Sequence, residues 1–365
     1  MFGRRRHAGA GTAGPRPGRA ARAWAVAAAA AAVVLTLAVG ADSPVPGSAL
    51  ASVAVTKDLA YAPAQPPGTQ GHLLDLYVPR SARPVPLVVF SSGSGWLADS
   101  GRQGADKVAA QLNPYGYAVA GVAIRSSSQA RFPAQLYDIK GAVRWLRGNA
   151  ARYHLDPDRI AIMGDSSGGW TAAMAAVTGD VPALEGDVGT YGPSSAVQAA
   201  VPFYPPTDFL RMDAHMPDGC AAFDAEFGLT GCHAGPGSPE SRLLGCPIER
   251  CPASLVAAAN PLTHIGRRRT PPFLILHGER DTVVPYDQSR LLYDKLAAAG
   301  DDARLITFPK AGHATLLGML SEHDTREGAY EKTSVNGHGT SARPLTPTWR
   351  TVVSFLDERL RPTGR

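Results

Sequence analysis

The alternation of strand-like and helix-like runs along residues 52–360 restricts the fold more than any other feature of the chain. In the clearest helical run, 133–153, aliphatic residues from Leu136 to Leu146 recur every three or four positions, the spacing of one buried face. Two strand-rich segments followed by strand–helix alternation predict an α/β fold: a mostly parallel eight-stranded sheet with helices on both faces. The expected strands are 52–62, 72–79, 85–92, 117–124, 159–164, 199–204, 272–278 and 303–309, and further helices are expected over 170–177, 289–300 and 348–360.

A strand, a tight turn and a helix follow one another around Ser166. The apolar run 159–164 leads into Gly164-Asp165-Ser166-Ser167-Gly168, and the alanine-rich run 170–177 comes next. This G-x-S-x-G pattern is typical of a nucleophile elbow, a sharp turn that holds a serine hydroxyl out for chemistry. The glycines suit a strained backbone, and the start of the following helix favours developing negative charge. An ordinary tight turn with a serine N-cap is the alternative interpretation.

A serine nucleophile needs a base, and the base needs an acid that orients it. Asp281 lies just after the expected strand 272–278, and His313 lies just after the expected strand 303–309. The order Ser, Asp, His along the chain is that of α/β-hydrolases. All three residues follow the carboxyl ends of strands, where ligands bind in open α/β sheets. We therefore predict the catalytic triad Ser166–Asp281–His313.

A polar run at 321–344 separates His313 from the last expected helix. It contains His323 and His338, which compete with His313 for the role of base, but no expected strand fixes either of them. Glu279 competes in the same way with Asp281. A loop of this length is functional or disordered, and its position beside His313 favours a part in shaping the site.

Four segments of the chain resemble secreted bacterial carboxylesterases grouped with feruloyl esterases, within the α/β-hydrolase superfamily. The resemblance covers roughly residues 70–315, nearly all of the chain after the first 51 residues. It implies an α/β-hydrolase domain over residues 52–365 and hydrolysis of a small-molecule ester, with kinship to the prolyl-oligopeptidase branch. The segments are GSGWL (93–97), the run from FPAQLYDIK to GDSSGG (132–169), SPESRLLGCPI (238–248) and HGERDTVVPYDQSRLLYDKLAAAG (277–300).

The loop after the third expected strand is the candidate oxyanion hole. In the family it usually reads His-Gly-Gly-Gly-Trp, whereas this chain has Ser92-Gly93-Ser94-Gly95-Trp96. Backbone amides do the donating, so the loss of the histidine leaves the reaction class unchanged. The resemblance implies Ser94, Gly95 and the amide of Ser167 as the donors. A second departure is the run AIRSSS (123–128), which stands where the family usually has Asp-Tyr-Arg-Leu and keeps only the arginine, Arg125. We interpret Arg125 as an ion-pair residue at the site entrance.

These residues together predict a serine hydrolase that cleaves carboxylic esters through an acyl-enzyme intermediate. The mechanism requires no cofactor and no metal. One alternative is an exopeptidase of the prolyl-oligopeptidase type, which generally carries a large propeller before the hydrolase domain. Another is a non-catalytic binding protein on a hydrolase scaffold, although such proteins typically lose a triad member and this chain keeps all three types.

The regular pattern breaks between about residues 205 and 270, a Pro- and Gly-rich stretch that we expect to form a cap inserted into the domain. It holds all four cysteines of the chain, Cys220, Cys232, Cys246 and Cys251. Zinc binding is a competing interpretation, but no spacing is C-x-x-C and no paired histidine pattern accompanies them. We predict the disulfides Cys220–Cys232 and Cys246–Cys251, because sequential pairing closes the two shortest loops.

Residues 1–51 have the composition of an export signal. Six arginines precede the alanine-rich apolar run 23–41, and Ala49-Leu50-Ala51 fits a small-x-small cleavage site. The run is long for a signal, and alanine is weakly lipophilic for a spanning helix. We expect a cleaved signal peptide, with an uncleaved N-terminal membrane anchor as the alternative. Either one predicts a protein that is secreted or on the extracytoplasmic face of the membrane.

The net charge of +5 arises within the same residues 1–51, which hold six of the 36 basic side chains and one of the 31 acidic ones. The other residues carry 30 of each (36 minus 6 and 31 minus 1), so they are neutral overall. This balance argues against nucleic acid or another polyanion as the partner.

Overall fold

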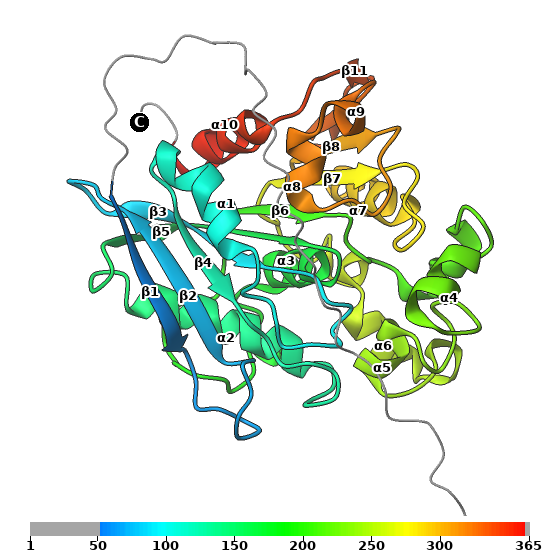
Figure 1. The fold of residues 1–365 in the computed structure, drawn as a ribbon, viewed down its shortest axis with the longest axis horizontal. Helices are drawn as coiled ribbons and strands as arrows, with labels where there is room; N and C mark the ends of the chain where they lie inside the picture. The colour runs from blue at the N-terminus through cyan, green and yellow to red at the C-terminus, as the bar shows by residue number, and fades with distance from the viewer. Residues whose placement is uncertain (1–51, 362–365) are drawn as a thin grey trace, which may run out of the picture. The chain divides into compact units, whose positions relative to one another are not determined.

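The computed structural model describes residues 52–361, in which ten α-helices surround one eleven-stranded sheet (Figure 1). The predicted signal or anchor, residues 1–51, lies outside the described residues. The strands are β1 (Val53–Ala60), β2 (Leu73–Pro79), β3 (Val85–Ser91), β4 (Ala118–Val122), β5 (Leu155–Asp165), β6 (Ala199–Phe203), β7 (Phe273–Gly278), β8 (Ala303–Phe308), β9 (Tyr330–Val335), β10 (His338–Gly339) and β11 (Arg343–Pro344). The helices are α1 (Ala105–Leu112), α2 (Ala134–Gly148), α3 (Ser167–Thr178), α4 (Ala221–Phe227), α5 (Pro239–Leu244), α6 (Ala253–Ala259), α7 (Asp287–Ala298), α8 (Leu316–Ser321), α9 (His323–Arg326) and α10 (Trp349–Leu360).

The strands follow the order β1-β2-β4-β3-β5-β6-β7-β8-β9-β10, with β11 beside β9. Neighbours from β4 through β8 run parallel, whereas β1, β2 and β9 are antiparallel additions at the two edges. All eight predicted strands are present, and the prediction of a mostly parallel sheet in an α/β-hydrolase fold is confirmed. Because β5, β7 and β8 are parallel, the residues that follow them lie at one edge of the sheet.

Two apolar cores cover the two faces of the sheet. Along β3, Leu87 and Val89 face the core that contains α2, α3 and α7, whereas Val88 and Phe90 face the core that contains α1 and α10. This alternation is the two-residue period of a strand, and both faces are apolar because helices cover both. The prediction of helices on both faces is confirmed.

The polar run 321–344 differs from its prediction as a loop, because it adds β9, β10 and β11 to the sheet. β9 pairs with β8, and β10 folds back onto β9 through Asn336 and Gly337, which both have positive φ angles. An Asn-Gly pair readily adopts these angles in a two-residue hairpin turn. The run therefore extends the edge of the sheet and does not line the cavity described below.

The segment between β6 and β7 forms the cap that the sequence predicts at about 205–270. It contains α4, α5 and α6, which lie close to one another at one side of the sheet (Figure 1). Disulfides join Cys220 to Cys232 and Cys246 to Cys251, so the predicted sequential pairing is confirmed. Among residues 52–361 no helix combines the length and apolarity needed to cross a membrane.

Candidate active site

Ser166 occupies the junction between β5 and α3, at the edge of the sheet where parallel strands end. Its φ and ψ angles are 54° and −123°, a conformation that a residue with a side chain rarely adopts. The backbone is held there by hydrogen bonds from the Ser166 N–H to the Phe203 carbonyl (3.0 Å) and from the Trp170 N–H to the Ser166 carbonyl (3.0 Å). Strain of this kind is characteristic of functional turns.

The two motif glycines permit this turn because other backbone passes very close to them. A Cβ atom at Gly164 would lie 2.3 Å from the Gly168 carbonyl oxygen, and one at Gly168 would lie 2.0 Å from the Ser91 carbonyl oxygen. Both distances are shorter than any normal contact. The glycines of the motif therefore meet a packing requirement between the elbow and β3.

His313 and Asp281 form a hydrogen-bonded pair at the same edge of the sheet. His313 Nδ1 lies 2.8 Å from Asp281 Oδ2, and the Asp281 carboxylate is fully buried. The other oxygen, Oδ1, accepts hydrogen bonds of 2.8 Å from the backbone N–H groups of Val283 and Val284. Since both oxygens have partners, the orientation of the carboxylate toward His313 is fixed.

The pairing shifts both pKa values in the direction that favours the charged forms, a protonated His313 and an ionised Asp281. Burial acts to lower the pKa of His313, but the charge and hydrogen bond of Asp281 outweigh it and the net pKa is raised. Burial acts to raise the pKa of Asp281, but His313 and His277 hold it well below its usual range. Asp281 is therefore ionised at any working pH, and His313 holds a proton more readily than a free imidazole.

Two groups that the sequence analysis did not identify support this pair. The buried His277, the fifth residue of β7, has Nε2 at 3.4 Å from Asp281 Oδ2 and Nδ1 at 2.7 Å from Ser289 Oγ. Tyr204, next to β6, packs its ring 4.6 Å from that of His313. A histidine inside an apolar strand, as in PFLILHG, is the sequence signal that could have identified His277.

The oxyanion loop differs in one respect from the prediction. The Ser94 N–H, one of the three predicted donors, donates to Ser167 Oγ at 2.9 Å. The N–H groups of Gly95 and Ser167 donate to no acceptor within residues 52–361. Trp96, buried in T-shaped contact with Trp170, anchors the loop. Gly95 and Ser167 are therefore the available donors, and Ser94 instead ties the loop to the elbow.

The predicted alternatives lie elsewhere. Glu279 Oε1 accepts a hydrogen bond from the Tyr330 hydroxyl at 2.8 Å, and His323 and His338 are exposed. None of the three lines the cavity that contains Ser166 and His313. Arg125 forms the expected ion pair, with its Nη2 2.7 Å from Asp138 Oδ1, but it does not line that cavity either.

Ser166 and His313 share a cavity of about 340 Å³ that the cap closes from one side. The sheet side contributes the oxyanion loop, the elbow and Tyr204. The cap contributes proline, aromatic and ionisable side chains. They are Pro206, Phe223, Glu226, Phe227, His233, Pro239 and Glu240.

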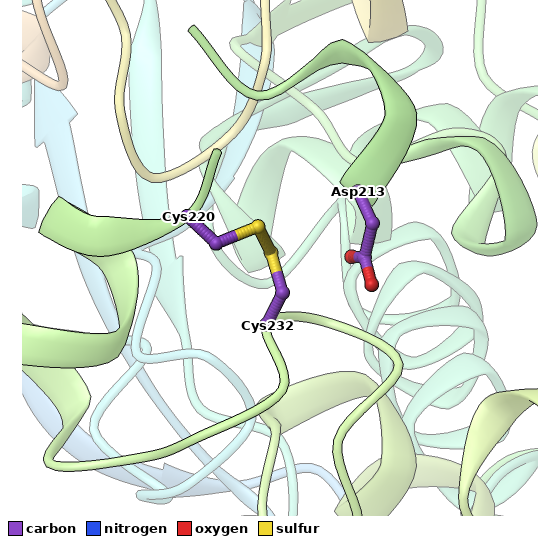
Figure 2. A group of neighbouring side chains, drawn as sticks. All are labelled: Asp213, Cys220 and Cys232. Atoms are coloured by element: carbon purple, nitrogen blue, oxygen red, sulfur yellow. A yellow bond between two sulfur atoms is a disulfide. The ribbon is translucent and has the colours of Figure 1, made fainter. Parts of the chain in front are cut away.

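A metal ion has poor support from the side chains present. In the described part of the chain, ligand atoms of Asp213, Cys220 and Cys232 lie within 4.8 Å of one another (Figure 2). The two sulfur atoms form a disulfide, so neither is a thiolate ligand. The Asp213 carboxylate accepts the backbone N–H groups of His233 and Ala234 at 3.0 and 3.2 Å. This group therefore organises the cap backbone.

Comparison with known proteins identifies the family. The model of the BD-FAE family matches residues 74–296, more than half of the chain. The chain belongs to the BD-FAE family. A curated relative, Esterase LipQ of Mycobacterium tuberculosis, is 30% identical over 276 residues, which cover 74% of this chain and 59% of LipQ. The chain thus spans less than two thirds of the length of that relative.

Solved structures of the same kind share this fold. A truncated carbohydrate esterase from gut microbiota is 31% identical, with a TM-score of 0.61 over 73% of this chain and 91% of that one. A bifunctional GH43-CE protein of Bacteroides eggerthii is 36% identical, with a TM-score of 0.61 over 71% of this chain and 35% of that one. BD-FAE membership and these likenesses agree with the resemblance expected from the sequence.

Proposed function

We propose that the chain is a carboxylic ester hydrolase that acts through Ser166, His313 and Asp281. The observation that carries the proposal is the strained Ser166 turn in the same cavity as a histidine paired with a buried carboxylate at 2.8 Å. The names of the relatives support the reaction class, since LipQ is an esterase and the gut protein is a carbohydrate esterase.

In the proposed mechanism, Ser166 Oγ attacks the ester carbonyl while His313 takes its proton through Nε2. The Asp281 carboxylate fixes His313 with Nδ1 protonated and stabilises the imidazolium that forms. The N–H groups of Gly95 and Ser167 stabilise the oxyanion. His313 then protonates the departing alcohol, and a water molecule, activated by the same histidine, releases the acid from Ser166.

Substitution of the proposed nucleophile tests this function. We expect Ser166→Ala to lower kcat for 4-nitrophenyl acetate by about 10³-fold or more, since the triad acts as a unit. The thermal unfolding midpoint should stay the same or rise, because the change removes one hydroxyl from a cavity wall. Ser354→Ala, at an exposed position of α10, is the matched control and should keep full activity. Full activity of Ser166→Ala would show that Ser166 is not the nucleophile.

We also propose that the protein is exported, with residues 1–51 as a cleaved signal or a membrane anchor. The two disulfides of the cap support this proposal, because disulfides persist mainly in oxidising compartments. The material recovered from the native host should lack these residues or remain membrane-bound. Full-length soluble chain in the cytoplasm, with free thiols, would contradict it.

A further inference from the structure

His233 and Glu240 of the cap line the proposed active-site cavity, lie close to each other and have no part in the triad. His233 Nδ1 lies 3.1 Å from Glu240 Oε2, with side-chain exposures of 1% and 4%. Within residues 52–361, Oε2 of Glu240 has no partner besides His233. A buried ion pair whose carboxylate has no further hydrogen bond is costly to keep, so this pair needs a reason beyond stability.

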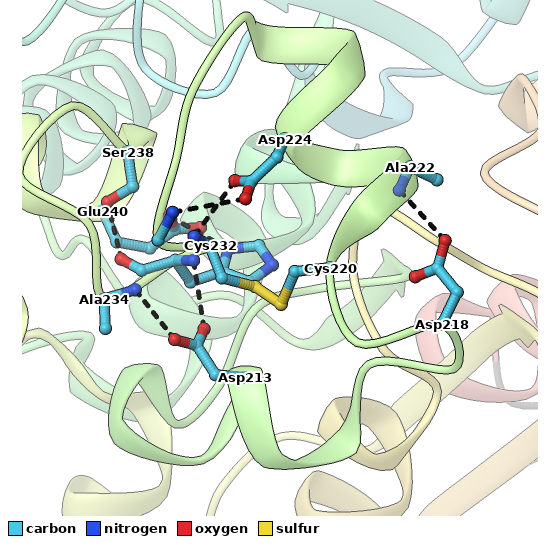
Figure 3. The surroundings of a disulfide bond; sticks show 11 residues. Asp213, Asp218, Cys220, Ala222, Asp224, Cys232, Ala234, Ser238 and Glu240 are labelled. Carbon is cyan, nitrogen blue, oxygen red and sulfur yellow. Dashed lines mark hydrogen bonds and ion pairs between the residues drawn. A yellow bond between two sulfur atoms is a disulfide. The ribbon is translucent and has the colours of Figure 1, made fainter.

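The Cys220–Cys232 disulfide and the Asp213 and Asp224 carboxylates hold the cap segment that contains His233 (Figure 3). The backbone N–H of His233 donates to Asp213 Oδ1 at 3.0 Å, and its carbonyl accepts the Ser238 hydroxyl at 2.6 Å. The preceding residue, Cys232, is bound to Cys220 and donates its N–H to Asp224 at 3.0 Å. The His233 ring lies 3.9 Å from that of Phe223. The position of the imidazole is therefore fixed before any ligand arrives.

Glu240 is fixed against the oxyanion loop. It follows Pro239, whose ring would lie 3.3 Å from a Cβ atom at Gly95. Ser238 caps the short helix α5 by accepting the Ser241 N–H at 3.0 Å. Glu240 therefore lines the cavity from an element in contact with the oxyanion loop.

The charges of the cavity indicate what this carboxylate can bind. Within the described part of the chain, the lining includes Asp165, Glu226 and Glu240 but neither lysine nor arginine. An anionic group would meet these carboxylates, and the His233 ring is already paired with Glu240. Burial acts to lower the pKa of His233, but Glu240 outweighs it and the net pKa is raised, so the pair is favoured as cation and anion. Because such a pair has no net charge, a neutral hydrogen-bond donor suits the Glu240 carboxylate better than a second cation does.

We propose that Glu240, positioned by His233, accepts a hydrogen bond from a hydroxyl group on the substrate, so that the enzyme selects hydroxylated esters over their plain counterparts. This inference rests on the proposed ester hydrolysis at Ser166. Glu240 is the group that contacts the substrate, and His233 is a positioning residue. A hydrogen bond to a charged acceptor is strong, and a substrate without the hydroxyl leaves His233 as the one partner of the Glu240 carboxylate within residues 52–361.

The test compares matched esters in a pH-stat: glycerol monoacetate with propyl acetate, and methyl 3-hydroxybutyrate with methyl butyrate. The first pair places the hydroxyls on the alcohol and the second on the acyl group. We expect kcat/KM of the purified protein to favour the hydroxylated ester of at least one pair by about tenfold or more. In Glu240→Gln that ratio should fall by about tenfold. Glu249→Gln, which removes the same charge from an exposed cap position, should leave the ratio unchanged.

Each outcome decides the matter. Equal rates for both members of both pairs in the unsubstituted protein would overturn the inference while the esterase proposal stands. A ratio that is unchanged in Glu240→Gln, with both rates lowered alike or not at all, would overturn it too. Selective loss of acetylcholine hydrolysis in that variant would show that Glu240 recognises charge instead. Hydrolysis of no ester, or hydrolysis that survives Ser166→Ala, would refute the proposed function and the inference with it.

Discussion

The Asp281–His313 pair makes the substitution Asp281→Asn a sharp test of the proposed mechanism. Asp281 Oδ1 accepts the N–H groups of Val283 and Val284, so the oxygen of an asparagine must occupy that position. The amide NH2 then faces His313 Nδ1, where the aspartate presents Oδ2 at 2.8 Å. Because an NH2 group only donates, His313 must accept through Nδ1 and carry its proton on Nε2. Histidine in that tautomer cannot take the proton of Ser166.

The expected loss is large. Forcing the wrong tautomer in this kind of triad lowers kcat by about 10⁴-fold, equivalent to about 5.5 kcal/mol in the activation free energy. Removal of the carboxylate also removes the charge that raises the pKa of His313. The acidic limb of the residual activity should therefore move to lower pH.

The assay is the pH dependence of kcat for a nitrophenyl ester, with thermal unfolding to verify the fold. Glu279→Gln is the matched control, since Glu279 is the other carboxylate of the same loop and binds the Tyr330 hydroxyl. It should retain activity. A folded Asp281→Asn variant within about tenfold of full activity would refute the role of Asp281, because a histidine in the wrong tautomer cannot retain so much activity.

Three further predictions follow from the same geometry. kcat/KM should fall as the pH drops through the pKa of His313, and because that pKa is raised the midpoint should lie above 6.5 in a pH–rate profile; a midpoint below 6.5 would contradict the assigned pairing. Gly168→Ala should destabilise the fold by about 1–3 kcal/mol or more in urea unfolding, since its Cβ would lie 2.0 Å from the Ser91 carbonyl oxygen; an unchanged midpoint would contradict this packing. Replacing Cys220 and Cys232 by serine should cost about 2–3 kcal/mol, seen as a lower unfolding midpoint in the variant than in the oxidised protein; equal midpoints would argue against a stabilising bridge.

The sheet and the three candidate triad positions could be predicted because each depends on a short local pattern. Ser166, Asp281 and His313 all follow an apolar run that is unambiguous as a strand, and parallel strands bring their ends together by geometry alone. The hairpin of β9 and β10 also had a local signal, the Asn336-Gly337 pair directly after Thr333 and Val335, which are β-branched. That signal was outweighed by the polarity of its surroundings, which is typical of an edge strand with one solvent-facing side.

The interior of the cap had no comparable signal. His233 and Glu240 meet through a disulfide, two partly buried carboxylate–amide contacts and a short helix, none of which produces a periodic pattern. The loop spacing predicted the pairing of the cysteines but not which side chains the bridged loops would turn into the cavity. The specificity proposed for Glu240 therefore depends on the part of the chain whose sequence constrains its structure least.

The Ser94 loop shows why even a correct family pattern fixes an oxyanion hole only in part. The φ angle of Ser94 is not positive, so a side chain is tolerated there, and the left-handed angles fall on Gly95 (58°) and Trp96 (55°). The hydroxyl of Ser94 donates to the Ala98 carbonyl at 3.0 Å, while its N–H donates to Ser167 Oγ. The serine in the loop is thus matched by a serine in the elbow, and their hydrogen bond ties the loop to the start of α3. Backbone donors leave no signature in a sequence, so only the side chains that position them can be recognised there.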